Sequence, residues 1–201
     1  MTGERTPSSR ADATRERLLV ATEELLAERG SHGAGLNEVC ARSGVAYGSL
    51  YHQFPKGKSD LVSTCVRRSG NAIGELLEAV LAQMPLADAV GVMFANGIAT
   101  LERSAFQRGC PVGTPAATSD DDALRAAAAD VFVRWRKSIA KSARREGRSA
   151  RAADDLASAL VSLYEGALLV ARIEQSIRPL RSAAAAAAVL VGVPTGSVVA
   201  R

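Results

Sequence analysis

The chain has 201 residues, of which 47% are hydrophobic and 23% are charged, and a formal net charge of +4. This balance is typical of an ordinary soluble protein of one or two domains and excludes a disordered chain. No apolar segment of a signal peptide precedes residue 20, and the three cysteines (Cys40, Cys65 and Cys110) are too few and too irregularly spaced for a disulfide framework. We therefore expect a cytoplasmic protein with reduced thiols and no membrane partner.

The positive charge hints at an anionic partner but does not locate it. Residues 1–60 carry eight basic and eight acidic side chains, whereas the excess lies in residues 125–151, with nine basic residues against Asp130 and Glu146. A solvated helix face is the simpler explanation of that later cluster. The two histidines, His32 and His52, suggest no metal site, and no cofactor motif is visible.

Apolar residues recur at helical spacing along the whole chain, which predicts an all-α fold. We expect a flexible N-terminal arm over residues 1–11, a DNA-binding domain over 12–66, a regulatory domain over 67–192 and a tail over 193–201. Within these limits the pattern predicts helices over 12–29, 36–43, 46–54, 58–82, 86–106, 120–144, 154–177 and 180–191, with a loop over 107–119.

The segment Gly44–Phe54, GVAYGSLYHQF, concentrates four ring side chains in a chain that is only 4% aromatic. Two short helices separated by a glycine turn are typical of a helix-turn-helix, whose second helix enters the major groove of DNA. Leu50 and Phe54 share one face and should pack inward. The remaining residues suit contacts with phosphates and base edges, because Gly48 permits close approach and the others carry polar tips: Tyr47, Ser49, Tyr51 and His52.

Residues 36–62, LNEVCARSGVAYGSLYHQFPKGKSDLV, resemble the DNA-binding domain of the TetR family of transcriptional repressors. The resemblance implies that Tyr47, Ser49, Tyr51, His52 and Lys58 contact DNA. Two positions depart from the family pattern, since Gly35 and Ala46 stand where helix-capping Ser or Thr is usual. We expect a looser recognition unit, with Asn37 replacing the missing phosphate contact.

The regulatory half also fits this resemblance, which implies a small-molecule pocket and dimerisation through the last two helices. Small and apolar side chains at spacings of three and four suggest the dimer contacts: Leu156, Leu160, Leu163, Ala167, Ala171, Ala184 and Ala187. The segment Phe106–Asp120, FQRGCPVGTPAATSD, resembles the subgroup with LmrA- and YxaF-like regulatory domains. A small apolar or aromatic effector is then expected, and its pocket candidates are Met93, Phe94, Cys110, Phe132, Trp135 and Tyr164.

These features predict a homodimeric repressor that binds a palindromic operator and is released by an effector. Two alternatives remain open: a DNA-binding regulator without a small-molecule effector, and a redox sensor that acts through the thiol of Cys110. An enzyme is not indicated, because the sequence shows no catalytic triad, Walker loop or metal-ligand set.

Overall fold

The computed structural model of the protein describes residues 10–192, and within them it contains nine helices and no strand, which confirms the all-α prediction. The expected arm and tail lie outside this range except for Arg10 and Ala11, which belong to the first helix. The helices are α1 (Arg10–Gly33), α2 (Leu36–Ser43), α3 (Tyr47–Gln53), α4 (Lys58–Gln83), α5 (Leu86–Arg103), α6 (Gly113–Ala117), α7 (Asp122–Arg145), α8 (Ala150–Glu174) and α9 (Arg178–Val191).

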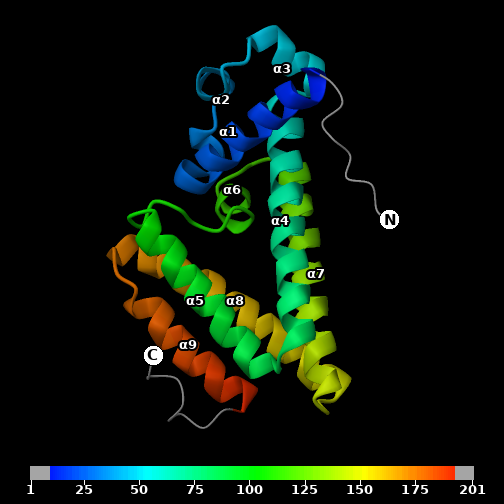
Figure 1. Ribbon diagram of the computed structural model, residues 1–201, viewed down its shortest axis with the longest axis vertical. Coiled ribbons are helices and arrows are strands. Elements are labelled where there is room, and N and C mark those ends of the chain that lie inside the picture. Colours follow the sequence, from blue (N-terminus) through cyan, green and yellow to red (C-terminus); the bar gives the residue numbers. More distant parts are fainter. Residues whose placement is uncertain (1–9, 193–201) are drawn as a thin grey trace.

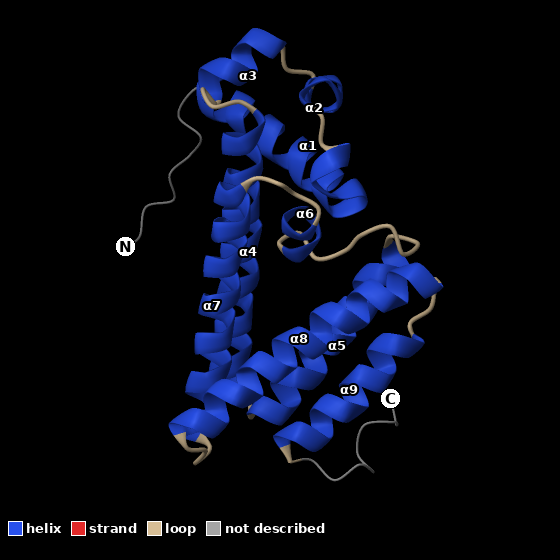
Figure 2. Ribbon diagram, turned by 180° about the vertical axis from the view of Figure 1, so that it is seen from behind, coloured by secondary structure: helices blue, strands red, loops and turns tan. Residues whose placement is uncertain are grey.

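The helices form two groups joined by α4 (Figure 1). Helices α1, α2 and α3 lie together at one end, and α4 runs from this group along the length of the molecule with α7 beside it (Figures 1 and 2). Helices α5, α8 and α9 pack at the other end, and the short α6 contacts both α1 and α7. One continuous set of buried apolar residues runs through both groups.

Several helix boundaries differ from the prediction by a few residues, and three departures have identifiable reasons. The loop expected over residues 107–119 contains the single-turn helix α6. Helix α8 begins at Ala150, before the expected residue 154, because the side chain of Ser149 caps it by accepting a hydrogen bond from the Ala152 N–H. Gly30 interrupts α1 in a left-handed conformation (φ 66°), but helical backbone resumes after it.

Helices α4 and α7 approach each other closely at Gly70, which is buried. A methyl group on Gly70 would lie 2.5 Å from one Cγ of Val131 and 3.1 Å from its Cβ. Nearby, the indole N–H of Trp135 donates a hydrogen bond of 3.0 Å to the carbonyl oxygen of Gly70. The pair of helices is therefore fixed by a contact that only glycine permits.

We predict that Gly70→Ala lowers the free energy of unfolding by about 1–3 kcal/mol, because the added methyl forces α4 and α7 apart. Gly91 is the matched control, since it is exposed in α5 and a Cβ there meets no atom within 4 Å. Gly91→Ala should instead raise stability by about 0.5–1 kcal/mol through helix propensity. Urea unfolding followed by circular dichroism measures both, and equal effects of the two substitutions would contradict the close-packing argument.

Candidate DNA-binding surface and ligand cavity

The turn between α2 and α3 is built by Gly44, which ends α2 in the left-handed conformation (φ 63°) and donates its N–H to the Cys40 carbonyl. Leu50 and Phe54 are buried, as the sequence predicts. The guanidinium of Arg15 in α1 lies 4.3 Å from the centre of the Phe54 ring and donates to the Gln53 carbonyl at 3.3 Å. The C-terminal end of α3 is thus held against the first helix.

The outer face of α3 carries the two tyrosines predicted to contact DNA. Tyr47 is 46% exposed and Tyr51 44%, and their rings lie 5.5 Å apart. A hydrogen bond with Tyr51 raises the pKa of the Tyr47 hydroxyl. Gly48 between them has open space where a side chain would be. This face can therefore approach another molecule closely.

The other predicted DNA contacts surround these rings. Asn37, Ser49 and His52 are exposed, and Lys58 is partly buried as the first residue of α4. Gly57 precedes it with φ 64°, and a Cβ there would lie 3.2 Å from Cε1 of Tyr51. The glycine turn thus allows the Tyr51 ring to lie against the start of α4.

Helices α2 and α3 begin without side-chain caps, as expected from Gly35 and Ala46. Their first backbone N–H groups therefore have no side-chain acceptor of their own. Helix α4, which follows Gly57, also has no side-chain cap. Acceptors such as phosphate oxygens can satisfy such groups from outside.

Several basic side chains of this region are already neutralised by carboxylates. Arg42 lies 3.2 Å from Glu28 in an ion pair, and Arg68 lies 2.6 Å from Glu16. By contrast, neither Lys56 nor Lys58 takes part in the ion pairs found within residues 10–192. The two lysines, like the exposed Arg17 of α1, therefore remain available to an anion.

A second feature is a cavity of about 690 Å³ between the two groups of helices. Its walls come from α1, α4, α5, α7 and α8 and from the segment before α6. The apolar part of the lining includes Val20, Ile73, Leu76, Leu77, Val80, Val92, Met93, Trp135, Ile139, Val161 and Leu168. A volume of this size suits a drug-sized molecule.

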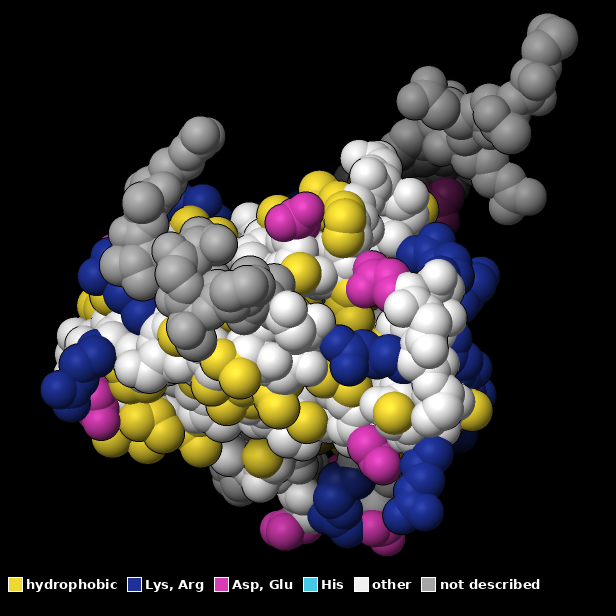
Figure 3. Space-filling model, turned by 90° about the horizontal axis from the view of Figure 1, so that it is seen from below, with side chains coloured by type: hydrophobic (Ala, Val, Ile, Leu, Met, Phe, Trp, Pro, Cys, Tyr) yellow, Lys and Arg dark blue, Asp and Glu magenta, His cyan; other side chains and the backbone are white. Residues whose placement is uncertain are grey.

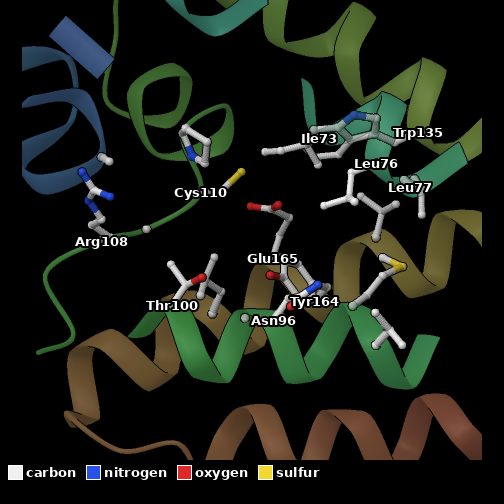
Figure 4. Close-up of a pocket in the computed structure, with 18 of the residues that line it drawn as sticks. Ile73, Leu76, Leu77, Asn96, Thr100, Arg108, Cys110, Trp135, Tyr164 and Glu165 are labelled. Atoms are coloured by element: carbon white, nitrogen blue, oxygen red, sulfur yellow. The ribbon is translucent and has the colours of Figure 1, made fainter. Parts of the chain in front are cut away.

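One end of this cavity is polar (Figure 4). Glu165 and Tyr164 of α8 point into it, with Asn96 and Thr100 of α5 nearby. Burial raises the pKa of the Glu165 carboxyl, while a hydrogen bond with the Cys110 thiol acts in the opposite direction. Burial likewise raises the pKa of Cys110 and of Tyr164. Glu165 is therefore a desolvated carboxyl at the cavity wall.

Of the six pocket candidates, four line this cavity: Met93, Cys110, Trp135 and Tyr164. Phe94 is buried behind it, with its ring edge-on to Tyr164 at 5.4 Å. Phe132 lines a neighbouring hollow of about 620 Å³, which shares Cys110 and Glu165 with the cavity. The sequence reasoning missed the polar lining, including Asn96, Thr100, Arg108 and Glu165, and the contribution of α1.

The segment before α6 is tied to both groups of helices by Arg172 of α8. Its guanidinium donates to the carbonyl of Gln107 at 2.9 Å and to that of Glu28, in α1, at 3.4 Å. The Gly109 N–H also donates to the Ala27 carbonyl at 3.1 Å. Ala105 and Phe106 have positive φ in this segment. Arg172 therefore connects α8, the edge of the cavity and α1.

Comparison with known proteins agrees with this arrangement. The family model for the N-terminal domain of bacterial regulatory proteins of the tetR family matches residues 18–65, and that for the C-terminal domain of LmrA/YxaF-like transcriptional regulators matches 87–186. The HTH-type transcriptional regulator Rv0196 of Mycobacterium tuberculosis is 30% identical over 173 residues, which cover 83% of this chain and 88% of that protein.

The chain belongs to the TetR family. It is a DNA-binding transcriptional regulator and not an enzyme. The HTH-type regulator LmrA of Bacillus subtilis is 28% identical, with 83% of this chain and 90% of LmrA covered. The crystal structure of a regulatory protein TetR from Rhodobacter sphaeroides superposes with a TM-score of 0.79 at 25% identity, covering 88% of this chain and 98% of that one.

The residues that the sequence suggested for dimerisation lie in the core of the protomer rather than on its surface. Leu156, Leu160, Ala167, Ala171 and Ala187 are buried within a single protomer, and Leu163 and Ala184 are partly buried against the same core. They are therefore unavailable as an outer surface in this conformation. The exposed apolar side chains of α8 and α9 are instead Leu169, Val170, Ile173, Val189 and Leu190.

Hydrophobic side chains form a band on the side of the molecule where α5, α8 and α9 lie (Figure 3). By length and composition alone α8 could cross a membrane. However, it packs against α7 and α9 and buries one full face, including Ala157, Leu160 and Ala171. It is therefore a core helix of the protomer that also carries an exposed apolar face.

The environment of Cys110 predicts an unreactive thiol. The thiolate is the reactive form, and Cys110 is only 5% exposed with its pKa raised mainly by burial. In the native protein at pH 7.5, we expect iodoacetamide to modify Cys110 at least about tenfold more slowly than in the urea-unfolded chain, because each unit of raised pKa removes about nine-tenths of the thiolate. Peptide mass spectrometry measures both rates, and equal rates would revive the redox-sensor alternative.

Proposed function

We propose that the protein is a ligand-responsive repressor that binds a palindromic operator as a homodimer in the cytoplasm and is released by a small effector. The observation that carries this proposal is the shared wall of the 690 Å³ cavity. Val20, Glu23, Glu24 and Ala27 of α1 line it together with the regulatory helices. A molecule in the cavity would therefore contact the DNA-binding domain directly.

The exposed apolar face of α8 and α9 supports the homodimer. Ile173 is 73% exposed and Leu169 57%, which is costly for isolated chains in water because contiguous apolar surface favours association. Two such helices from each protomer suit a four-helix interface. A two-fold pair would present two copies of α3 to successive major grooves, which requires a separation of about 34–36 Å.

Release follows from a difference in affinity between conformations. An effector shifts the population only if it binds the conformation that cannot span the operator better than the one that can. Since α1, α4 and the segment held by Arg172 all border the cavity, a change in its width would alter the position of α3. A regulator without an effector is the weaker alternative because it leaves this cavity without a role.

Substitutions on the outer face of α3 and at the start of α4 test the DNA contacts. On DNA from the region upstream of its own gene that contains a palindrome, Tyr51→Ala and Lys58→Ala should each weaken binding by about 1–3 kcal/mol. Lys58→Ala should also reduce the slope of log affinity against log salt by about 1, since one phosphate contact is lost. Fluorescence anisotropy at several salt concentrations measures both quantities.

Lys141→Ala is the control for that experiment, because Lys141 is exposed on α7 in the other group of helices. It should bind the operator as the wild-type protein does. If Tyr51→Ala and Lys58→Ala also retain the wild-type affinity and salt slope, α3 is not the recognition helix.

A charge on the exposed face of α8 tests the dimer. Ile173→Glu should convert the dimer to monomers at micromolar concentration, because it places a charge within the apolar contact. Val133→Glu is the matched control, since Val133 is an exposed apolar residue of α7. Sedimentation velocity distinguishes the species, and an Ile173→Glu variant that stays dimeric would place the interface elsewhere.

A further inference from the structure

The lining of the cavity is apolar in one part and polar at the other end, and this difference restricts the molecules that fit it. Its larger part is lined by aliphatic side chains of α4 and α5 and by Trp135 of α7. Its other end collects Glu165, Asn96 and Thr100 (Figure 4). A ligand must therefore present an apolar body to one end and a polar group to the other.

Glu165 is the acidic group that a ligand would meet at the polar end of the cavity. It lines both the cavity and the neighbouring hollow, so it stands where the two spaces meet. Its Oε2 lies so close to Gly113 that a Cβ on that residue would be 2.8 Å away. The absence of a side chain at Gly113 thus leaves room for the carboxyl group between α6 and α8.

The hydrogen bonding of this carboxyl is incomplete. Its side-chain partner is the thiol of Cys110, which is a weak donor. Glu165 takes part in none of the ion pairs found within residues 10–192. Glu165 is half-buried at the cavity wall, and a carboxylate can accept more hydrogen bonds than this one, at a cost in free energy when water is displaced from it without replacement. A strong donor brought by a ligand would remove that cost.

We propose that the effector is an apolar, ring-bearing molecule with a hydrogen-bond donor, an amine or a hydroxyl group, that binds to the Glu165 carboxyl. This inference rests on the proposed ligand-responsive function and specifies its ligand class. The charges elsewhere around the cavity do not reverse the preference. Glu23 and Glu24 add negative charge on α1, and Arg103 and Arg108 add positive charge to the cavity lining. Arg125, Arg136 and Arg172 line the neighbouring hollow, but none of these arginines forms an ion pair with Glu165 within residues 10–192.

Four bicyclic probes of similar shape separate the possibilities: 1-naphthylmethylamine, 1-naphthylmethanol, its methyl ether and 1-naphthoate. They present a cationic donor, a neutral donor, an acceptor and an anion on the same ring system. The chain has one tryptophan, and Trp135 lines the cavity, so a single indole N–H signal in a ¹⁵N correlation spectrum reports binding. Titration at pH 7 of the full-length protein, without DNA, gives the four dissociation constants.

We expect the amine to bind at least about tenfold more tightly than the ether and the naphthoate, with the alcohol between them. Glu165→Gln should weaken amine binding about tenfold, which corresponds to about 1.4 kcal/mol, and should change binding of the alcohol by less than about threefold, because an amide oxygen still accepts a hydrogen bond. Glu174→Gln is the control. It removes the same charge from an exposed position on the same helix and should change nothing.

Other outcomes overturn the inference. Tightest binding of the naphthoate, equal binding of all four probes, or an unchanged amine affinity in Glu165→Gln would each exclude Glu165 as the donor-recognising group. These results would leave a ligand-responsive repressor intact, because binding itself would persist. If no probe shifts the Trp135 signal, both this inference and the effector role of the cavity fail, while the DNA-binding measurements stand independently.

Discussion

The close contact between α4 and α7 at Gly70 is the constraint on which the remaining geometry depends. Helix α4 begins beside the helix-turn-helix with Lys58 and continues into the cavity wall with Ile73, Leu76 and Leu77. Its direction is fixed where the backbone of Gly70 meets Val131 and receives the hydrogen bond from Trp135. The same hydrogen bond orients the Trp135 ring toward the cavity, so the shape of the pocket and the position of the DNA-binding domain share one support.

A second link between these helices lies at the end of the molecule where α1, α2 and α3 are grouped. The carboxylate of Asp121 caps α7 by accepting from the N–H groups of Ala123 and Leu124. A hydrogen bond from Ser59, next to Lys58 in α4, lowers the pKa of Asp121 most strongly. Asp121 therefore lies where the starts of α4 and α7 meet.

The sequence predicted the helix-turn-helix well because its signals are local. The left-handed turn after α2 favours a glycine, which Gly44 supplies. Leu50 and Phe54 are separated by one helical turn, so their common buried face follows from spacing alone.

The dimer surface was harder to predict from the sequence, because apolar periodicity identifies a buried face without showing what covers it. The apolar stripe through Leu156 and Leu160 is covered by other helices of the same protomer. The exposed Leu169 and Ile173, by contrast, do not stand out from the other apolar residues of α8 in the sequence. Glu165 was missed for a related reason: a single acid within the apolar middle of α8 is expected at a solvent-exposed position unless the fold shows what surrounds it.

The free energies of the ion pairs around α1 indicate how a ligand in the cavity would influence DNA binding. Glu24 and Glu23 line the cavity and also lie 3.9 Å from Arg42 of α2 and 3.4 Å from Arg68 of α4. Such half-exposed ion pairs contribute at most about 1 kcal/mol each, whereas a change from 1:99 to 99:1 between conformations needs about 5.5 kcal/mol of differential binding. Breaking these pairs is therefore insufficient by itself. The larger share must come from packing: a rigid ring system that fits only a widened cavity would displace α1 and α4 as units. The carbonyl contacts of Arg172 with Glu28 and Gln107 would then transmit that displacement to α8 and to the partner protomer.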